Sequence, residues 1–166
     1  MSFLDSADDD PRRANRRPLL FFVLVTEAIG ALASVFTEPN IEGWYAGLLH
    51  PSFAPPNWVF APVWATLYAL MAVAAWRVWR ITGTKSPEMI AYALQLIFNF
   101  AWSAIFFAAH QIELAFLEIC ILVALILATT ILFWKRDRLA GLLFLPYLGW
   151  TSFAAFLTYA FWTLNP

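Results

Sequence analysis

The sequence predicts an all-α integral membrane protein built as a bundle of five transmembrane helices. The composition is 62% hydrophobic and only 13% charged, which is more apolar surface than one soluble core can bury. Five apolar stretches follow one another, each close to the roughly 20 residues that a helix needs to cross a bilayer core of about 30 Å. All ten Lys and Arg residues fall in alternate gaps between these stretches, as expected for loops on one side of a membrane.

The same basic residues predict the orientation of the chain. Short segments rich in Lys and Arg stay on the cytoplasmic side, so we expect the N-terminus in the cytoplasm and the C-terminus outside. The basic residues precede the first stretch or lie in the second-to-third and fourth-to-fifth gaps: Arg12, Arg13, Arg16, Arg17, Arg77, Arg80, Lys85, Lys135, Arg136 and Arg138.

Each apolar stretch should form a helix, because lipid satisfies no backbone hydrogen bond and the alternation of a membrane β-barrel is absent. We predict that residues 1–17 form a disordered basic tail without a signal-peptide cleavage site, and that residues 18–166 form one transmembrane domain. The spans are placed at residues 18–36, 62–81, 87–109, 112–134 and 139–164.

The connection at residues 37–61 is the long one, and it is rich in proline and aromatic residues. Prolines oppose helix formation, and so many aromatic rings are unusual for a merely solvated linker. We expect this loop to pack onto the outer mouth of the bundle. Alternatively, some of its rings belong to an aromatic belt at the lipid interface.

A polar stripe runs along the third span, where Gln95, Asn99 and Ser103 recur every four residues and Phe106 and Phe107 continue the same face. Amide groups are costly in hydrocarbon, so the stripe should face the bundle interior or a cavity. Two interpretations stay open. The amides either form hydrogen bonds that hold helices together, or Asn99 orients a polar group of a bound ligand.

Aromatic residues at helical spacing lie on two other spans. Trp64 and Tyr68 are one turn apart on the second span, and Trp150 and Ala154 repeat this spacing on the fifth. Together with Asn99 they provide the apolar walls and the few polar groups of a small-molecule pocket. The alternative is that these rings only pack the core.

Signs of catalysis are few. Glu27 and Glu118 lie inside spans with no basic residue at the same depth, so each needs a hydroxyl partner, a cavity or a proton. His50, His110 and Cys120 have no further ligands at metal-binding spacing, and we expect no metal site. The segregated charges provide no basic surface, so nucleic acid is not an expected partner.

Several sequence blocks resemble the TspO/MBR family, the tryptophan-rich sensory proteins related to the mitochondrial translocator protein or peripheral-type benzodiazepine receptor. The most specific block is PPNWVFAPVW at residues 55–64. The matching runs are WY at residues 44–45, HPSFAPPNWVF at 50–60, PVWATLY at 62–68, FNFAWS at 98–103 and PYLGW at 146–150.

The resemblance implies a membrane receptor or sensor that binds porphyrin or haem-type tetrapyrroles and benzodiazepine-type ligands, and that regulates tetrapyrrole or stress responses. No obligatory cofactor is expected, and porphyrin or haem is the ligand. By the same resemblance, the ligand pocket is lined by Tyr45, Trp64, Tyr68, Asn99, Ser103, Trp150 and Ala154.

Two other functions stay open: a transporter of tetrapyrroles or other small hydrophobic molecules, and a light-dependent porphyrin-degrading enzyme. In the enzyme, the residues implied are Trp64 and Trp150, whose electron-rich indoles are readily oxidised. The resemblance also implies a homodimer, and the pairs Gly30 with Ser34 and Ala104 with Ala108 permit close helix contact within or between chains. The bacterial cytoplasmic membrane is expected, with the outer membrane as the alternative.

The sequence departs from the family pattern at three positions. His50 replaces the commoner Lys before a proline, and Thr158 stands where Asn is usual. No basic residue follows Tyr159, so the proposed cholesterol-recognition pattern is incomplete. We therefore do not expect sterol binding through that motif.

Overall fold

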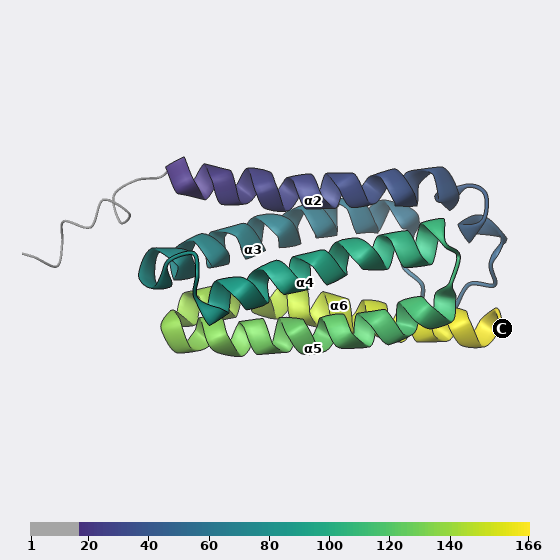
Figure 1. The fold of residues 1–166 in the computed structure, drawn as a ribbon. Helices are drawn as coiled ribbons and strands as arrows, with labels where there is room; N and C mark the ends of the chain where they lie inside the picture. The colour runs from purple at the N-terminus through teal and green to yellow at the C-terminus, as the bar shows by residue number, and fades with distance from the viewer. Residues whose placement is uncertain (1–16) are drawn as a thin grey trace, which may run out of the picture.

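The computed structural model describes residues 17–166, which form a bundle of five long helices (Figure 1). All five are long and apolar enough to cross a membrane, and this part of the chain contains no strand, so the predicted fold class is confirmed. The helices are α2 (Arg17–Ile41), α3 (Phe60–Thr82), α4 (Pro87–Ser103), α5 (Ile112–Arg136) and α6 (Arg138–Leu164). Short turns are η1 (Tyr45–Gly47), η2 (Asn57–Val59) and the π-helical turn η3 (Ala104–Ala108).

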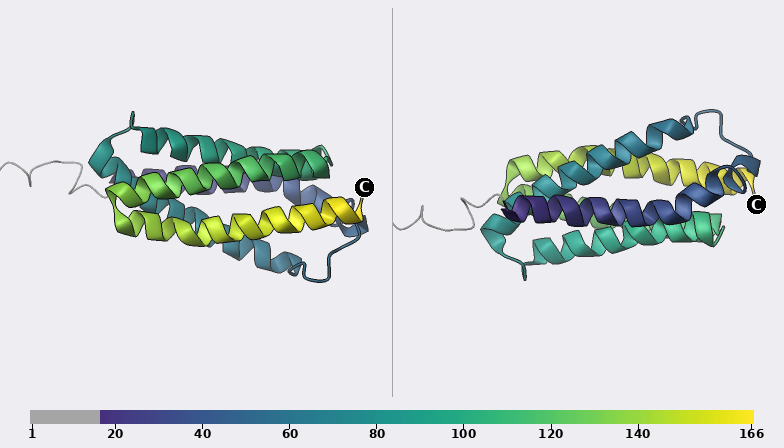
Figure 2. Two further views of the ribbon diagram at one scale, coloured as in Figure 1. Left: turned by 90° about the horizontal axis from the view of Figure 1, so that it is seen from below. Right: turned by 90° about the horizontal axis from the view of Figure 1, so that it is seen from above.

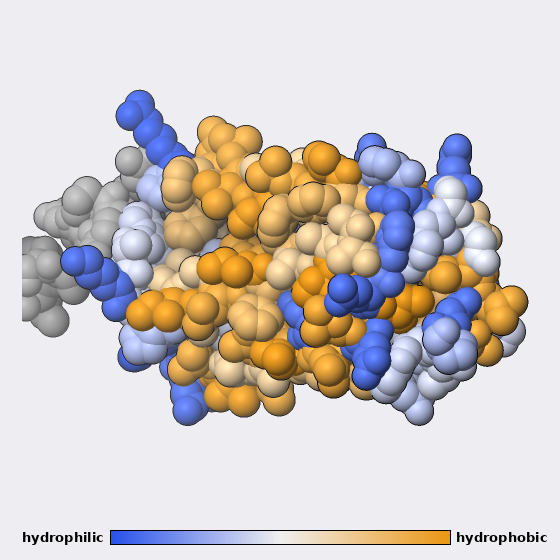
Figure 3. Space-filling view, turned by 45° about the vertical axis from the view of Figure 1, so that its right-hand side comes forward, coloured by the Kyte–Doolittle hydropathy of each residue, from blue (hydrophilic) through white to orange (hydrophobic). Residues whose placement is uncertain are grey.

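The helices form a closed ring in the order α2, α3, α6, α5, α4. Figure 2 shows α2 between α3 and α4 in one view, and α5 beside α6 in the other. The middle of the visible surface is hydrophobic, and hydrophilic side chains gather toward both ends (Figure 3). This distribution matches a bilayer core between two aqueous boundaries.

The basic residues of the described chain gather at one end of the bundle, here called the basic end. It comprises the start of α2, the α3–α4 turn and the α5–α6 turn, which lie together on the left of Figure 1. The opposite end, here called the loop end, carries residues 42–59, the turn before α5 and the C-terminus. The segregation seen in the sequence is therefore also spatial. Which end faces the cytoplasm stays a prediction, and the predicted tail lies outside the described residues except for Arg17.

The first helix is longer than predicted. It ends at Ile41 instead of residue 36. The other helix ends agree within two residues when η3 is counted as the continuation of α4. The helix continues because Pro39 removes only one backbone donor in its last turns. Nearby, the Thr37 hydroxyl donates to the Ala33 carbonyl at 3.3 Å and Asn40 Nδ2 donates to the Phe36 carbonyl at 2.9 Å.

Two ion pairs at the basic end join helices that are distant in sequence. Arg77 Nε lies 2.6 Å from Asp137 Oδ2, and Arg136 Nε lies 2.6 Å from Glu88 Oε1. Asp137 also caps α6, since its Oδ1 accepts a hydrogen bond from the Leu139 backbone at 2.9 Å. One aspartate thus fixes the α5–α6 turn and connects it to α3, a role that was not predicted from the sequence.

We expect Asp137→Ala to destabilise the protein by about 1–2 kcal/mol at neutral pH, by removing a helix cap and a partly buried ion pair. Burial opposes ionisation of Asp137, but its hydrogen bonds and the charge of Arg77 outweigh burial and lower its pKa. A carboxyl group whose pKa is lower in the folded state stabilises that state above its unfolded pKa of about 4. The contribution is lost as the pH falls through the lower folded value.

The effect is measured by thermal unfolding of wild type and Asp137→Ala in detergent at several pH values from about 3 to about 7. This range extends to both sides of the unfolded pKa of about 4. The difference should shrink below about pH 4, and Asp137→Asn should keep part of the stability because Asn also caps helices. A stability difference that does not depend on pH would contradict the assignment.

Candidate functional site

The bundle contains a cavity of about 530 Å3, toward the loop end, whose wall includes residues of all five long helices and of η3. This volume is within the range of about 300–1,000 Å3 found for small-molecule sites. The wall is mostly apolar, as such sites require. All seven residues predicted for the pocket lie on this wall: Tyr45, Trp64, Tyr68, Asn99, Ser103, Trp150 and Ala154. Their part in ligand binding stays a prediction.

The polar stripe of α4 forms part of a buried hydrogen-bond chain across three helices. Tyr68 Oη donates to Asn99 Oδ1 at 2.6 Å, and Asn99 Nδ2 donates to Tyr147 Oη at 3.0 Å. Tyr147 Oη in turn donates to Gln95 Oε1 at 2.8 Å. The amides therefore do hold helices together, and Asn99 also borders the cavity. The two interpretations of the stripe are compatible.

The indole rings on the wall are held by neighbouring aromatic rings. Trp64 stacks on Tyr68 with ring centroids 5.6 Å apart and meets Tyr147 edge-on at 6.2 Å. Trp150 meets Phe60 edge-on at 5.8 Å. Such contacts restrict ring orientation, so the wall is preorganised for a flat apolar ligand.

The π-helical turn at η3 brings two consecutive aromatic residues to the cavity. The Ala109 amide donates to the Ala104 carbonyl at 2.9 Å, the i to i−5 pattern of a π turn. Phe106 and Phe107 are both buried and both line the cavity. In an undistorted α-helix, consecutive side chains point about 100° apart around the helix axis. The wider π-helical turn reduces this angle, so both rings face the cavity.

The loop at residues 42–59 covers the loop end of the cavity through Tyr45. This side chain is buried against Phe106, Phe107 and Phe161, and burial raises the pKa of its hydroxyl. The loop is also attached to the C-terminus, because Asn165 Oδ1 accepts from the Leu49 amide at 2.8 Å.

Other aromatic rings of this loop remain outside the bundle. Phe53 is 44% exposed and Trp58 is 75% exposed. The loop therefore fits both alternatives, packing onto the bundle and contributing rings to an interfacial belt. Tyr45 packs over the cavity, while Phe53 and Trp58 are exposed where they can contact lipid or the interface.

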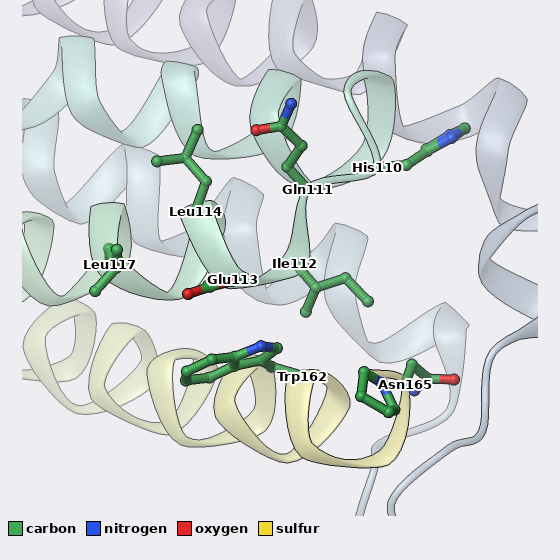
Figure 4. Close-up of a pocket in the computed structure, with 9 residues that line it drawn as sticks. His110, Gln111, Ile112, Glu113, Leu114, Leu117, Trp162 and Asn165 are labelled. Atoms are coloured by element: carbon green, nitrogen blue, oxygen red, sulfur yellow. The ribbon is translucent and has the colours of Figure 1, made fainter.

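A second hollow, of about 550 Å3, lies at the loop end between the start of α5 and the end of α6 (Figure 4). It contains none of the predicted site residues. His110, Glu113, Leu117, Trp162 and Asn165 are on its wall. His110 adopts a φ of 57° and stacks on Trp44 at 4.2 Å, which indicates a structural role in the turn.

The part of the wall that α2 contributes was mostly not predicted from the sequence. Glu27 and Gly30 both lie on it, and a Cβ atom at Gly30 would overlap the ring of Tyr68. Gly30 therefore provides close contact within the chain. Glu118 lies off the wall, and both its carboxylate oxygens are buried without a hydrogen-bond partner among residues 17–166. Neither acid forms an ion pair with a described residue.

Known proteins are similar to this sequence over most of its length. The sequence model of the TspO/MBR family matches residues 22–163. The chain belongs to the TspO/MBR family. The family assignment made from the sequence blocks is thus confirmed, and the five-helix bundle is the structure of a TspO/MBR protein.

Individual members of the TspO/MBR family match at similar levels. The translocator protein of Sus scrofa is 37% identical over 89% of this chain and 90% of its own. Protein CrtK of Rhodobacter capsulatus is 36% identical over 82% and 86%, respectively. The tryptophan-rich protein TspO of Archaeoglobus fulgidus is 35% identical over 89% and 96%. These relatives support a multi-pass membrane protein.

Proposed function

We propose that this protein is a membrane receptor or sensor that binds a porphyrin or haem-type tetrapyrrole in the aromatic cavity. The observation that carries the proposal is one enclosed wall that combines Trp64, Trp150 and the amide of Asn99. A flat aromatic ligand would stack on the indoles and exclude water, while the amide sets its orientation. Benzodiazepine-type ligands have the same requirements and belong to the same proposal.

The hydrogen-bond chain suggests how binding could be sensed. Tyr68 and Asn99 touch the cavity, and Tyr147 and Gln95 continue the chain into the core between α4 and α6. A ligand that competes for Asn99 would change contacts that connect three helices. Regulation of tetrapyrrole or stress responses would then follow from a change in helix packing.

We expect Trp64→Ala to weaken porphyrin binding at least about tenfold, which corresponds to about 1.4 kcal/mol. The lost indole face provides part of the stacking surface, and the truncation leaves a gap beside Tyr68. Quenching of tryptophan fluorescence by protoporphyrin IX in lipid nanodiscs measures the affinity.

The matched control is Trp58→Ala, which removes one fluorophore from an exposed position off the cavity wall. It should bind like wild type. Equal affinity of Trp64→Ala and wild type would refute the site.

Illumination of the same samples distinguishes the remaining functions. A chemically altered porphyrin, with loss of the product in Trp150→Phe, would indicate the enzyme. Accumulation of porphyrin in sealed proteoliposomes would indicate the transporter. The homodimer also remains a prediction, and light scattering of the protein in detergent would test it.

A further inference from the structure

The carboxyl group of Glu118 is buried inside the bundle, off the wall of the cavity. The residue is 7% exposed, and both carboxylate oxygens are buried without a hydrogen-bond donor among residues 17–166. Its place on α5 is about 9 Å along the helix axis from Ile112, where the helix begins. This carboxyl group is therefore surrounded by protein and not by water.

No cation of the described chain pairs with this carboxyl group. Lys135 is the nearest basic residue on the same helix, about 25 Å away along the axis. The two histidines lie outside the long helices, where the ring of His50 contacts the Tyr45 carbonyl and that of His110 contacts Asn40. Helix α5 packs against α3, α4, η3 and α6, and the Lys and Arg residues of all these elements lie at the basic end: Arg77, Arg80, Lys135, Arg136 and Arg138.

The other titratable groups on α5 and on the elements packed against it supply no positive charge. Glu88 and Asp137 are paired with arginines at the basic end, and Glu113 is exposed at the start of α5. The hydroxyl of Tyr147 interacts electrostatically with Glu118, but it is already part of the hydrogen-bond chain to α4. The remaining groups are Tyr68, Tyr92, Cys120 and Tyr159.

An ionised carboxylate is very unfavourable where neither a cation nor a hydrogen-bond donor compensates for its lost hydration, and a buried acid takes up a proton instead. We infer that Glu118 is a proton-binding site, where the folded protein holds a neutral carboxylic acid inside the bundle at neutral pH. The inference does not depend on what the cavity binds.

The bound proton also affects helix packing. Helix α5 lies between α4 and α6 in the ring of helices. Release of the proton to water would leave an uncompensated charge in the interior of the bundle, and this charge becomes stable only when water reaches it. The contacts of α5 with its neighbours would have to open to admit that water. Proton release at Glu118 therefore loosens this side of the bundle.

Infrared spectroscopy of the full-length protein in nanodiscs tests the protonation directly, because a carboxylic acid and a carboxylate absorb at different frequencies. At neutral pH, the difference spectrum of wild type minus Glu118→Gln should contain a carboxylic-acid C=O band that shifts in D2O. Glu113→Gln is the matched control, since Glu113 is exposed on the same helix and its loss should remove only carboxylate bands. A carboxylate band from Glu118 in place of the acid band would overturn the inference.

Thermal unfolding from about pH 5 to about pH 9 provides the second arm. A glutamate of the unfolded chain ionises above about pH 4.3, whereas folded wild type keeps the proton on Glu118. The unfolded state then binds fewer protons, so the stability of wild type should fall with rising pH relative to Glu118→Gln. The Tm difference between the two should grow by about 3 °C or more over this range. A difference that is constant with pH, as expected for Glu113→Gln, would count against the inference.

Wild type alone provides a third measurement, which does not depend on the folding of a variant. The pH is raised until the acid band is lost, and amide hydrogen exchange is corrected for its intrinsic dependence on pH. Exchange should then become faster in the first half of α5 and in the part of α6 that packs against it, with α2 as the internal control. Unchanged exchange in α5 after loss of the band would show that the proton does not affect the packing.

Discussion

Replacing Gly141 with alanine is expected to destabilise the bundle by about 1–3 kcal/mol, the usual cost of overpacking a tight core. A Cβ atom at this position would lie 2.7 Å from Trp134 Cε3 and 2.8 Å from Trp134 Cα. The second contact is with backbone, so no side-chain rotation relieves it. Helices α5 and α6 would have to move apart near their connecting turn.

Gly149 on the same helix provides the control, because nothing lies within 4 Å of a Cβ built there. Gly149→Ala should be neutral or stabilising by up to about 1 kcal/mol, since alanine restricts the unfolded chain. In unfolding by heat or SDS, Gly141→Ala should therefore be clearly less stable than wild type, and Gly149→Ala should be at least as stable as wild type. Equal stability of both variants would show that the α5–α6 crossing is looser than described.

Tyr147→Phe is expected to have the second large effect, a loss of about 2–6 kcal/mol. Tyr147 is fully buried, and its hydroxyl accepts from Asn99 and donates to Gln95. Its removal leaves two buried amide groups without these partners, at about 1–3 kcal/mol for each. Ligand affinity should fall as well, because Asn99 loses one of the two bonds that hold it at the cavity.

Tyr159→Phe is the matched control on α6, as Tyr159 is 44% exposed and has no partner in the chain of bonds. A double variant, Gln95→Leu with Tyr147→Phe, should recover part of the loss, because two apolar partners leave fewer unsatisfied groups. The hydrogen-bond chain would be contradicted if Tyr147→Phe were as stable as Tyr159→Phe.

The fold was largely predictable because its causes are local. Span length follows from bilayer thickness, and helical structure follows from the absence of water around the backbone. The predicted end of α2 was wrong by five residues, since the prolines of residues 37–61, Pro39 among them, were expected to oppose helix formation. A proline in the last turns of a helix destabilises the helix little, because few backbone hydrogen bonds remain to be lost there. The side-chain hydrogen bonds that accompany it depend on local geometry, and composition alone does not predict them.

The candidate site was predictable in part. Tyr68 and Asn99 were identified from spacing and family resemblance, and both lie on the cavity wall. The central position of Tyr147 was missed, although it lies one turn before Thr151 on the wall-facing side of α6. A tyrosine in a membrane helix has many possible partners, and only the crossing of α4 and α6 selects Gln95 and Asn99.

The sequence by itself determined that this chain crosses a membrane five times, that the basic residues of its described part share one end, and that it belongs to a family of tryptophan-rich proteins. These properties depend on transfer of residues from water to lipid and on positions along single helices. Only the tertiary structure decided that Glu27 and Glu38 border the cavity without a cation, and that Gly30 and Gly141 set two helix contacts. The reason is that the shape and charge of the cavity depend on how separate helices are rotated and crossed against one another. The residue pattern of one helix does not specify which residues of another helix it will contact.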